Sequence, residues 1–94
     1  MRVTWTPNAV RALATIIETI SLDNKISAGK FRDRILTLVY KTLTTAPLIG
    51  KPGRVTNTRE FVVYSSYQLV YRVKDGVIQI ISLRHSARLW PICM

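Results

Sequence analysis

The sequence YQLVYRVKDGVIQIISL, residues 67–83, predicts a β-hairpin. Two runs rich in β-branched and aromatic residues flank Asp75-Gly76, a pair that readily adopts the two positive φ angles of a type I′ turn. Residues 67–73 largely alternate in polarity, whereas residues 77–83 are almost continuously apolar, as in a strand that is covered on both faces. We therefore expect the second strand to be central in a sheet.

Two helices are predicted upstream of this hairpin, after a short strand at residues 2–5. Thr6-Pro7 provides an N-cap with proline at the first helical position, which predicts a helix over residues 7–22. A second cap at Ser27 predicts a helix that ends near Thr45. The apolar faces are expected to comprise Val10, Leu13, Ile16, Ile17 and Ile20 in the first helix and Ala28, Phe31, Ile35, Leu38 and Thr42 in the second.

The remaining segment connects the helices to the hairpin. Residues 46–58 contain two prolines, two glycines and Asn57, which predicts a loop with a short strand at residues 54–56. Residues 59–64 have strand composition, and Ser65-Ser66 provides a turn. We expect a single α+β domain over residues 1–94: an N-terminal strand, a helical hairpin and a three-stranded antiparallel meander, with the helices packed on one face of a four-stranded sheet.

Composition restricts the functional classes. Fourteen Lys and Arg residues oppose five Asp and Glu, so the formal charge is +9, and a field of this sign favours nucleic acid, anionic surfaces or an acidic partner. Cys93 is the single cysteine, which excludes an internal disulfide and a multi-cysteine metal site and points to the cytosol. The sequence has neither a signal-peptide pattern nor an apolar run of about 18 residues, so no membrane span is expected.

The second helix carries more apolar side chains than one core contact requires. Leu36, Val39, Tyr40 and Leu43 form a second stripe beside the first. Either both stripes pack within the domain, or the second one lines a groove for a partner helix. The sequence leaves both alternatives open.

Several short motifs resemble the ParE branch of the RelE/ParE toxin superfamily. They are Gly53-Arg54-Val55, Thr58-Arg59-Glu60-Phe61, Tyr71-Arg72-Val73, and His85 with Ala87-Arg88 and Trp90-Pro91. The resemblance covers nearly the whole chain and implies the toxin of a bacterial type II toxin–antitoxin pair. The sequence lacks a glycine-rich phosphate loop, a paired-carboxylate site and His/Cys/Asp metal spacing, so we expect no cofactor or metal. The charge of +9 and the second apolar stripe favour an acidic antitoxin along the helical hairpin, where we expect contacts to Leu13, Ile17, Leu36, Tyr40 and Leu43.

The two branches of the superfamily differ in chemistry. RelE-like members cleave mRNA on the ribosome, whereas ParE-like members poison DNA gyrase. The absence of a tyrosine after Tyr71 favours the ParE reading, with DNA gyrase as the partner and no catalytic residue. The expected gyrase-binding residues are then Arg54, Arg59, Arg84, His85, Arg88 and Trp90.

The alternative is an mRNA endoribonuclease acting with the ribosome. Arg59, Glu60 and His85 would then supply charge stabilisation and proton transfer. Structural roles compete with both readings: Glu60 could pair with Arg59, His85 could be a hydrogen-bonding group, and Trp90 could fill the core. A third function is a basic nucleic-acid-binding module without a toxic target, although helix-turn-helix spacing and interleaved sheet aromatics are absent.

Overall fold

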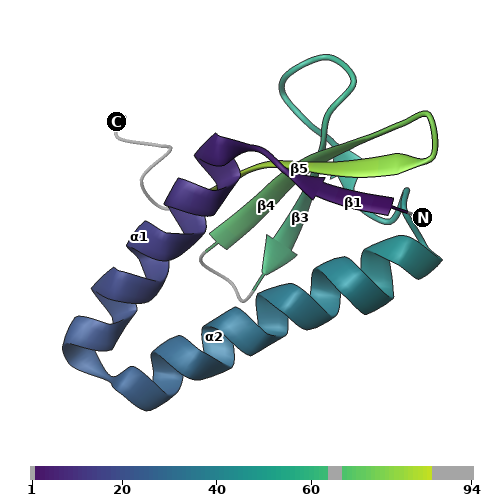
Figure 1. The fold of residues 1–94 in the computed structure, drawn as a ribbon. Coiled ribbons are helices and arrows are strands. Elements are labelled where there is room, and N and C mark those ends of the chain that lie inside the picture. The colour runs from purple at the N-terminus through teal and green to yellow at the C-terminus, as the bar shows by residue number, and fades with distance from the viewer. Residues whose placement is uncertain (1, 64–66, 86–94) are drawn as a thin grey trace.

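The protein folds into two helices and a five-stranded mixed sheet, as seen in a computed structural model that describes residues 2–63 and 67–85 (Figure 1). The sheet order is β1-β5-β4-β3-β2, in which β1 is parallel to β5 and the other neighbours are antiparallel. The elements are β1 (Arg2–Trp5), α1 (Pro7–Asp23), α2 (Lys25–Thr37), the π-helical segment η1 (Leu38–Leu43), β2 (Lys51–Pro52), β3 (Arg59–Val63), β4 (Tyr67–Lys74) and β5 (Val77–His85).

This arrangement confirms the predicted α+β class and differs from it in one strand. The additional strand is β2, which pairs with the start of β3, whereas the short strand predicted at residues 54–56 is a turn. The turn predicted at Ser65-Ser66 lies outside the described residues. Within the described part of the chain, no helix has the length and apolar character required to cross a membrane.

The β4–β5 hairpin forms as predicted. Asp75 and Gly76 have φ angles of 53° and 75°, the two positive values that a type I′ turn requires. β5 has neighbours on both sides, but β4 is the middle strand. Only one face of β5 is fully buried, so the expected cover on both faces is wrong.

A β-bulge explains the almost continuous apolar run in β5. Val70 pairs with Ser82 and Tyr71 with Ile80, so Ile81 is an extra residue without a partner on β4. The bulge resets the alternation and leaves both Ile80 and Leu83 buried. An apolar run that is typical of two covered faces therefore reflects, in this strand, an inserted residue.

Thr6 fixes the start of α1 to this bulge. Its hydroxyl accepts a hydrogen bond from the N–H of Ala9 at 3.1 Å and donates one to the carbonyl oxygen of Ile81 at 2.9 Å. The predicted N-cap is thus confirmed, and it also uses a carbonyl of the bulged residue. Ala9 is buried in the core, whereas Val10, predicted to face inward, is 53% exposed.

The second helix begins earlier than predicted and changes pitch near its end. Asn24 is its N-cap, because the Asn24 side chain accepts hydrogen bonds from the N–H groups of Ile26 and Ser27; the cap predicted at Ser27 is wrong. The helix continues through η1 to Thr45, as predicted. Its wider π turn changes which residues face the sheet, so Leu43 is buried and Thr42 is half-buried.

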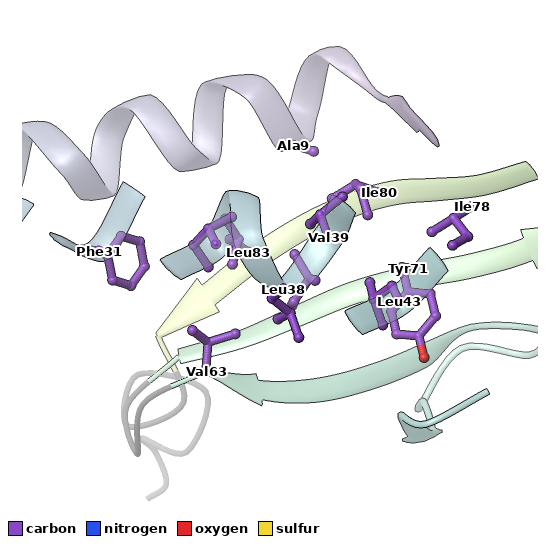
Figure 2. Close-up of a cluster of buried hydrophobic side chains, with 12 residues drawn as sticks. Ala9, Phe31, Leu38, Val39, Leu43, Val63, Tyr71, Ile78, Ile80 and Leu83 are labelled. Atoms are coloured by element: carbon purple, nitrogen blue, oxygen red, sulfur yellow. The ribbon is translucent and has the colours of Figure 1, made fainter. Parts of the chain in front are cut away.

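The core lies between the helices and one face of the sheet (Figure 2). The two helices diverge from their connection in a V on this side of the sheet (Figure 1). The helical contribution comes from Ala9, Phe31, Ile35, Leu38, Val39 and Leu43, and the strands contribute Val63, Leu69, Tyr71, Ile78, Ile80 and Leu83. Because strand residues alternate between faces, residues such as Glu60 and Arg84 lie on the face that the helices leave uncovered.

Candidate functional site: a buried carboxylate, its arginines and the helical surface

A buried carboxylate lies on the sheet face opposite the helices. Glu60 is only 4% exposed, and its Oε2 accepts a hydrogen bond from Arg84 Nη2 at 2.9 Å. The backbone N–H of Arg54 donates to the same oxygen at 3.3 Å. Glu60 therefore pairs with Arg84 and not with Arg59, and the same carboxylate oxygen also holds the backbone of Arg54.

Gln68 completes this polar cluster. It lies opposite Arg84 on the neighbouring strand and is 8% exposed. Gln68 Oε1 and Arg84 Nε are buried and have no hydrogen-bond partner among the described residues. An unsatisfied buried polar group costs about 1–3 kcal/mol of stability. The cluster therefore retains a hydrogen-bond acceptor on Gln68 and a donor on Arg84 that its own side chains do not satisfy.

Arg59 lies on the opposite, helix-facing side of the sheet and serves a loop. Its Nη1 donates to the carbonyl oxygens of Gly50 and Leu48, at 2.6 and 3.2 Å. Its cross-strand neighbour Tyr71 donates to the carbonyl oxygen of Pro47 at 2.8 Å and accepts from the N–H of Gly50 at 2.9 Å. Burial raises the pKa of Tyr71, although the Gly50 hydrogen bond and the charge of Arg59 oppose this shift. Both side chains thus hold residues 47–50 against the sheet.

His85 belongs to an aromatic cluster. Its ring packs edge-to-face on Tyr67 with centroids 4.8 Å apart, and Tyr67 packs in the same manner on Phe31 at 5.0 Å. His85 Nδ1 is buried and has no hydrogen-bond partner among the described residues. In the described part of the chain, the contact that the imidazole makes is this aromatic packing.

The three residues of the endoribonuclease alternative do not converge. Glu60 lies on the uncovered face, whereas Arg59 and His85 belong to the helix-facing side. Arg59 is opposite Tyr71 and His85 is opposite Tyr67, four residues apart on β4, which corresponds to roughly 13 Å along a strand. Among the predicted gyrase-binding residues, Arg54 and Arg84 meet at Glu60, Arg59 is on the other side, and Arg88 and Trp90 lie outside the described residues.

The residues predicted to contact an antitoxin differ in their exposure on the helices. Leu13 and Ile17 are half-buried, and Leu36 and Tyr40 are 38% and 51% exposed. Leu43 is fully buried, so it does not belong to the exposed stripe. The hydroxyl of Tyr40 accepts a hydrogen bond from Trp5 Nε1 at 3.0 Å, which ties η1 to β1. An apolar surface with one anchored aromatic therefore remains open on the helices.

A cavity at the hairpin end of the sheet was not predicted from the sequence. It has a volume of about 580 Å³ and is lined by Leu48, Pro52, Asn57, Thr58, Arg59, Arg72, Val73 and Lys74. The sequence feature that points to this cavity is the difference in strand length: β4 continues to Lys74, beyond Tyr71, the residue opposite the first residue of β3. In the described part of the chain, no three His, Cys, Asp or Glu residues are grouped as metal ligands.

Comparisons with known proteins agree on one family. The family model described as the ParE toxin of the type II toxin–antitoxin system parDE matches residues 3–90. Y4kP of Sinorhizobium fredii, named as a predicted toxin, is 35% identical over 96% of this chain and 93% of its own length. Toxin RelE2 of Caulobacter vibrioides is 33% identical over 94% of this chain and 98% of its own.

Solved structures show the same fold. A chain of the chromosomal ParDE toxin–antitoxin system from P. aeruginosa superposes with a TM-score of 0.77 at 25% identity, covering 90% of this chain and 95% of that one. YafQ from E. coli superposes with a TM-score of 0.59 at 15% identity, covering 96% and 99%. Because the family model spans nearly all of the chain and two relatives exceed 30% identity, this protein belongs to the family of ParE toxins of type II toxin–antitoxin systems.

Proposed function

We propose that this toxin acts in the cytoplasm by binding DNA gyrase, and that it does not itself cleave RNA. The proposal extends the family assignment, since the ParE resemblance implies gyrase as the target. The relative named RelE2 makes mRNA cleavage the competing function.

One observation carries the proposal: among the described residues, the three candidates for RNA cleavage, Arg59, Glu60 and His85, are separated and engaged in other contacts. Proton transfer requires a group within about 2.6–3.2 Å of the reacting atom, or one water away. Glu60 is held by Arg84, Arg59 by two carbonyl oxygens, and His85 by an aromatic contact. Bringing them to one phosphate would require Glu60 to leave Arg84 and His85 to leave its aromatic contact, because the three side chains lie on two faces of the sheet. A binding function leaves these arrangements in place.

The charge of the chain suits a binding function. A formal charge of +9 accelerates association with an acidic surface or with an enzyme bound to DNA. Arg84 is 30% exposed beside the buried carboxylate, so its guanidinium is partly available at the uncovered sheet face. Arg54 and Arg84 are therefore the described arginines that we assign to the gyrase-binding surface, with Arg88 and Trp90 following in the sequence.

The second part of the proposal concerns neutralisation. We assign the open helical surface, with Leu13, Ile17, Leu36 and Tyr40, to a cognate acidic antitoxin. The P. aeruginosa structure comes from a ParDE toxin–antitoxin system, which supports such a partner. Apolar contacts would hold the antitoxin, and its negative charge would speed the encounter with this basic toxin.

The decisive experiment compares two reactions with the same purified toxin. One is supercoiling by purified gyrase, and the other is translation of a defined mRNA by purified ribosomes, with the mRNA ends mapped. We expect inhibition of supercoiling and intact mRNA. Ribosome-dependent cleavage that is lost in Glu60→Gln, together with unchanged supercoiling, would replace gyrase binding with the endoribonuclease function.

A further inference from the structure

The end of the sheet near the hairpin turn contains an unfilled strand edge. β3 and β4 pair from Val63 and Tyr67 up to Arg59 and Tyr71, but β4 continues to Lys74. Residues 72–74 therefore have no strand neighbour on the β3 side. The connection between β2 and β3 and the β4–β5 turn lie at this same end of the sheet (Figure 1).

The cavity of about 580 Å³ opens at this edge. Its position explains why residues from both faces of β4 line it: Val73 belongs to the helix-facing side, and Arg72 and Lys74 to the other. The lining combines the apolar side chains of Leu48, Pro52 and Val73 with the uncharged polar side chains of Asn57 and Thr58. The volume falls in the range of small-ligand sites, about 300–1,000 Å³.

The charge in the cavity has one sign. Its lining includes the cations Arg59, Arg72 and Lys74 and contains no carboxylate. Asp75 instead lines a shallower depression on the adjoining surface, which it shares with Arg72 and Lys74. Cations that line one cavity without a carboxylate among them repel one another and favour an anion with several negative oxygens.

Two of these cations are held in position by the fold. Arg59 Nη1 is fixed by the carbonyl oxygens of Leu48 and Gly50, and Arg72 Nε donates to Gln79 Oε1 at 2.6 Å. A guanidinium has five N–H donors, so both arginines retain donors beyond these bonds. Their planar forks match phosphate oxygens, whereas Lys74 adds a mobile point charge.

We propose that this cavity binds the phosphate groups of a nucleotide, either free or as part of a nucleic-acid strand. The cationic side takes the phosphates, and the apolar side formed by Leu48, Pro52 and Val73 takes the base or sugar. The cavity opens at the turn end of β4, and its lining includes neither Glu60 nor Arg84. Arg84 is opposite Gln68 near the start of β4, whereas Glu60 follows Arg59 on β3 but faces the uncovered side of the sheet. Nucleotide binding is thus a property separate from the proposed action on gyrase.

The test measures binding by the purified toxin without gyrase or ribosomes. ATP is the free-nucleotide probe, titrated by calorimetry, and a fluorescein-labelled short single-stranded DNA is the strand probe, followed by anisotropy over a salt series. The variants are Lys74→Glu and Arg72→Gln. The matched control is Lys30→Glu, which makes the same charge change at an exposed position on α2 outside the cavity.

We expect Lys74→Glu to weaken binding of the recognised probe about tenfold or more, as expected for a lost charged contact. Arg72→Gln should weaken it as well, and for DNA each variant should reduce the salt slope by about 1. A loss confined to ATP identifies a free nucleotide, and a loss confined to DNA identifies a strand. If both cavity variants bind both probes as well as Lys30→Glu does, or if neither probe binds the parent protein, the proposal is wrong. Thermal denaturation of every variant separates lost binding from lost folding.

Discussion

Arg84 and Glu60 form an ion pair of 2.9 Å on the sheet face that the helices leave uncovered, with the carboxylate almost fully buried and the guanidinium partly exposed. This pair links β3 to β5 across β4 and also receives the backbone of the β2–β3 connection at Arg54. The contact that connects these strands therefore also determines how much of the Arg84 guanidinium is exposed.

Removing the Arg84 side chain should destabilise the fold more than removing the charge of Glu60. Arg84→Ala leaves a buried carboxylate with only a backbone donor, and we expect a loss of about 1–3 kcal/mol in the free energy of unfolding. Glu60→Gln in the Arg84→Ala background should restore part of this loss, since no buried charge remains. Urea unfolding of the two single variants and the double variant measures the coupling, and purely additive losses would contradict it.

This coupling affects how toxicity data are interpreted. A double change of Arg84→Ala with Arg88→Ala should weaken toxicity, but part of that effect would come from the fold. Arg88→Ala alone tests the proposed target-binding surface while both members of the Glu60–Arg84 pair stay in the protein. Growth arrest after induction, read beside the amount of folded toxin, separates the two contributions.

Tyr71 should make stability depend on alkaline pH. Its pKa in the folded state is raised above the ordinary value of 10.0, mainly by burial, so the folded protein holds the hydroxyl proton more tightly than the unfolded chain does. The resulting stabilisation is complete below pH 10.0 and is lost as the pH rises through the folded-state pKa. The free energy of unfolding should therefore fall more steeply above this pH in the parent than in Tyr71→Phe.

At neutral pH, Tyr71→Phe measures how much the hydrogen bonds to residues 47–50 contribute to stability. Tyr71→Phe removes the hydroxyl that bonds Pro47 and Gly50, and it should cost about 1–2 kcal/mol. Unfolding curves at neutral and alkaline pH provide both measurements. Parallel pH profiles for parent and variant would show that the Tyr71 hydroxyl does not titrate differently in the two states.

Adding a side chain should lower stability at Gly76 and raise it at Gly29. Gly76 has a φ of 75°, and the space that a Cβ atom would occupy there is open, so Gly76→Val introduces backbone strain without a clash. We expect a cost of about 1–2 kcal/mol, which corresponds to a melting temperature lower by several degrees. Gly29 lies inside α2 with equally open space, and Gly29→Ala should raise stability by about 0.4–1 kcal/mol. Differential scanning calorimetry of both variants tests the turn geometry, which an unchanged Gly76→Val melting curve would contradict.

His85 should be dispensable for toxicity. Its ring packs on Tyr67, and an edge-to-face contact of this kind contributes about 0.5–1.5 kcal/mol. His85→Phe preserves an aromatic ring and removes the titratable group, and His85→Ala removes both. We expect both variants to arrest growth, with a lower melting temperature only for His85→Ala. Loss of toxicity in a stably folded His85→Phe protein would assign the imidazole a chemical role.

The elements that could be predicted from the sequence depend on local chemistry. Asp75-Gly76 and Thr6-Pro7 each specify a turn or a cap within a few residues, and the structure contains both. The π turn and the bulge at Ile81 result from packing between distant segments, which no short pattern encodes. These two irregularities explain why Leu43 is buried among the core residues and why only one face of β5 is fully buried.

The site residues illustrate a different limit. Arg59 and Glu60 are adjacent on a strand, so their side chains necessarily point to opposite faces, and the predicted pair between them could have been excluded from the sequence. The partner that Glu60 does use, Arg84, depends on the register of β4 with both neighbouring strands and on the bulge. Similarly, Arg72 and Lys74 line a cavity only because β4 extends beyond the first residue of β3.

The exposed apolar side chains of the second helix should determine antitoxin binding. Leu36 and Tyr40 are exposed, so an aspartate at either position places charge in an apolar contact. Tyr40→Asp also removes the hydrogen bond from Trp5 Nε1, so thermal denaturation must show that this variant is folded, and Leu36→Asp tests the surface without that loss. Leu36→Asp and Tyr40→Asp should each weaken binding of the antitoxin encoded beside the toxin by about tenfold or more, as for central interface residues.

Val55→Asp provides the control for this experiment. Val55 is 66% exposed in the β2–β3 connection, and the substitution makes the same change in charge and polarity away from the helices. Surface plasmon resonance with the purified antitoxin compares the three variants. Because the lost contacts are apolar, the effect should appear mainly in the dissociation rate and should persist at high salt. Equal binding of the two helix variants and Val55→Asp would place the antitoxin on another surface, with the free edge of β1 as the next one to test.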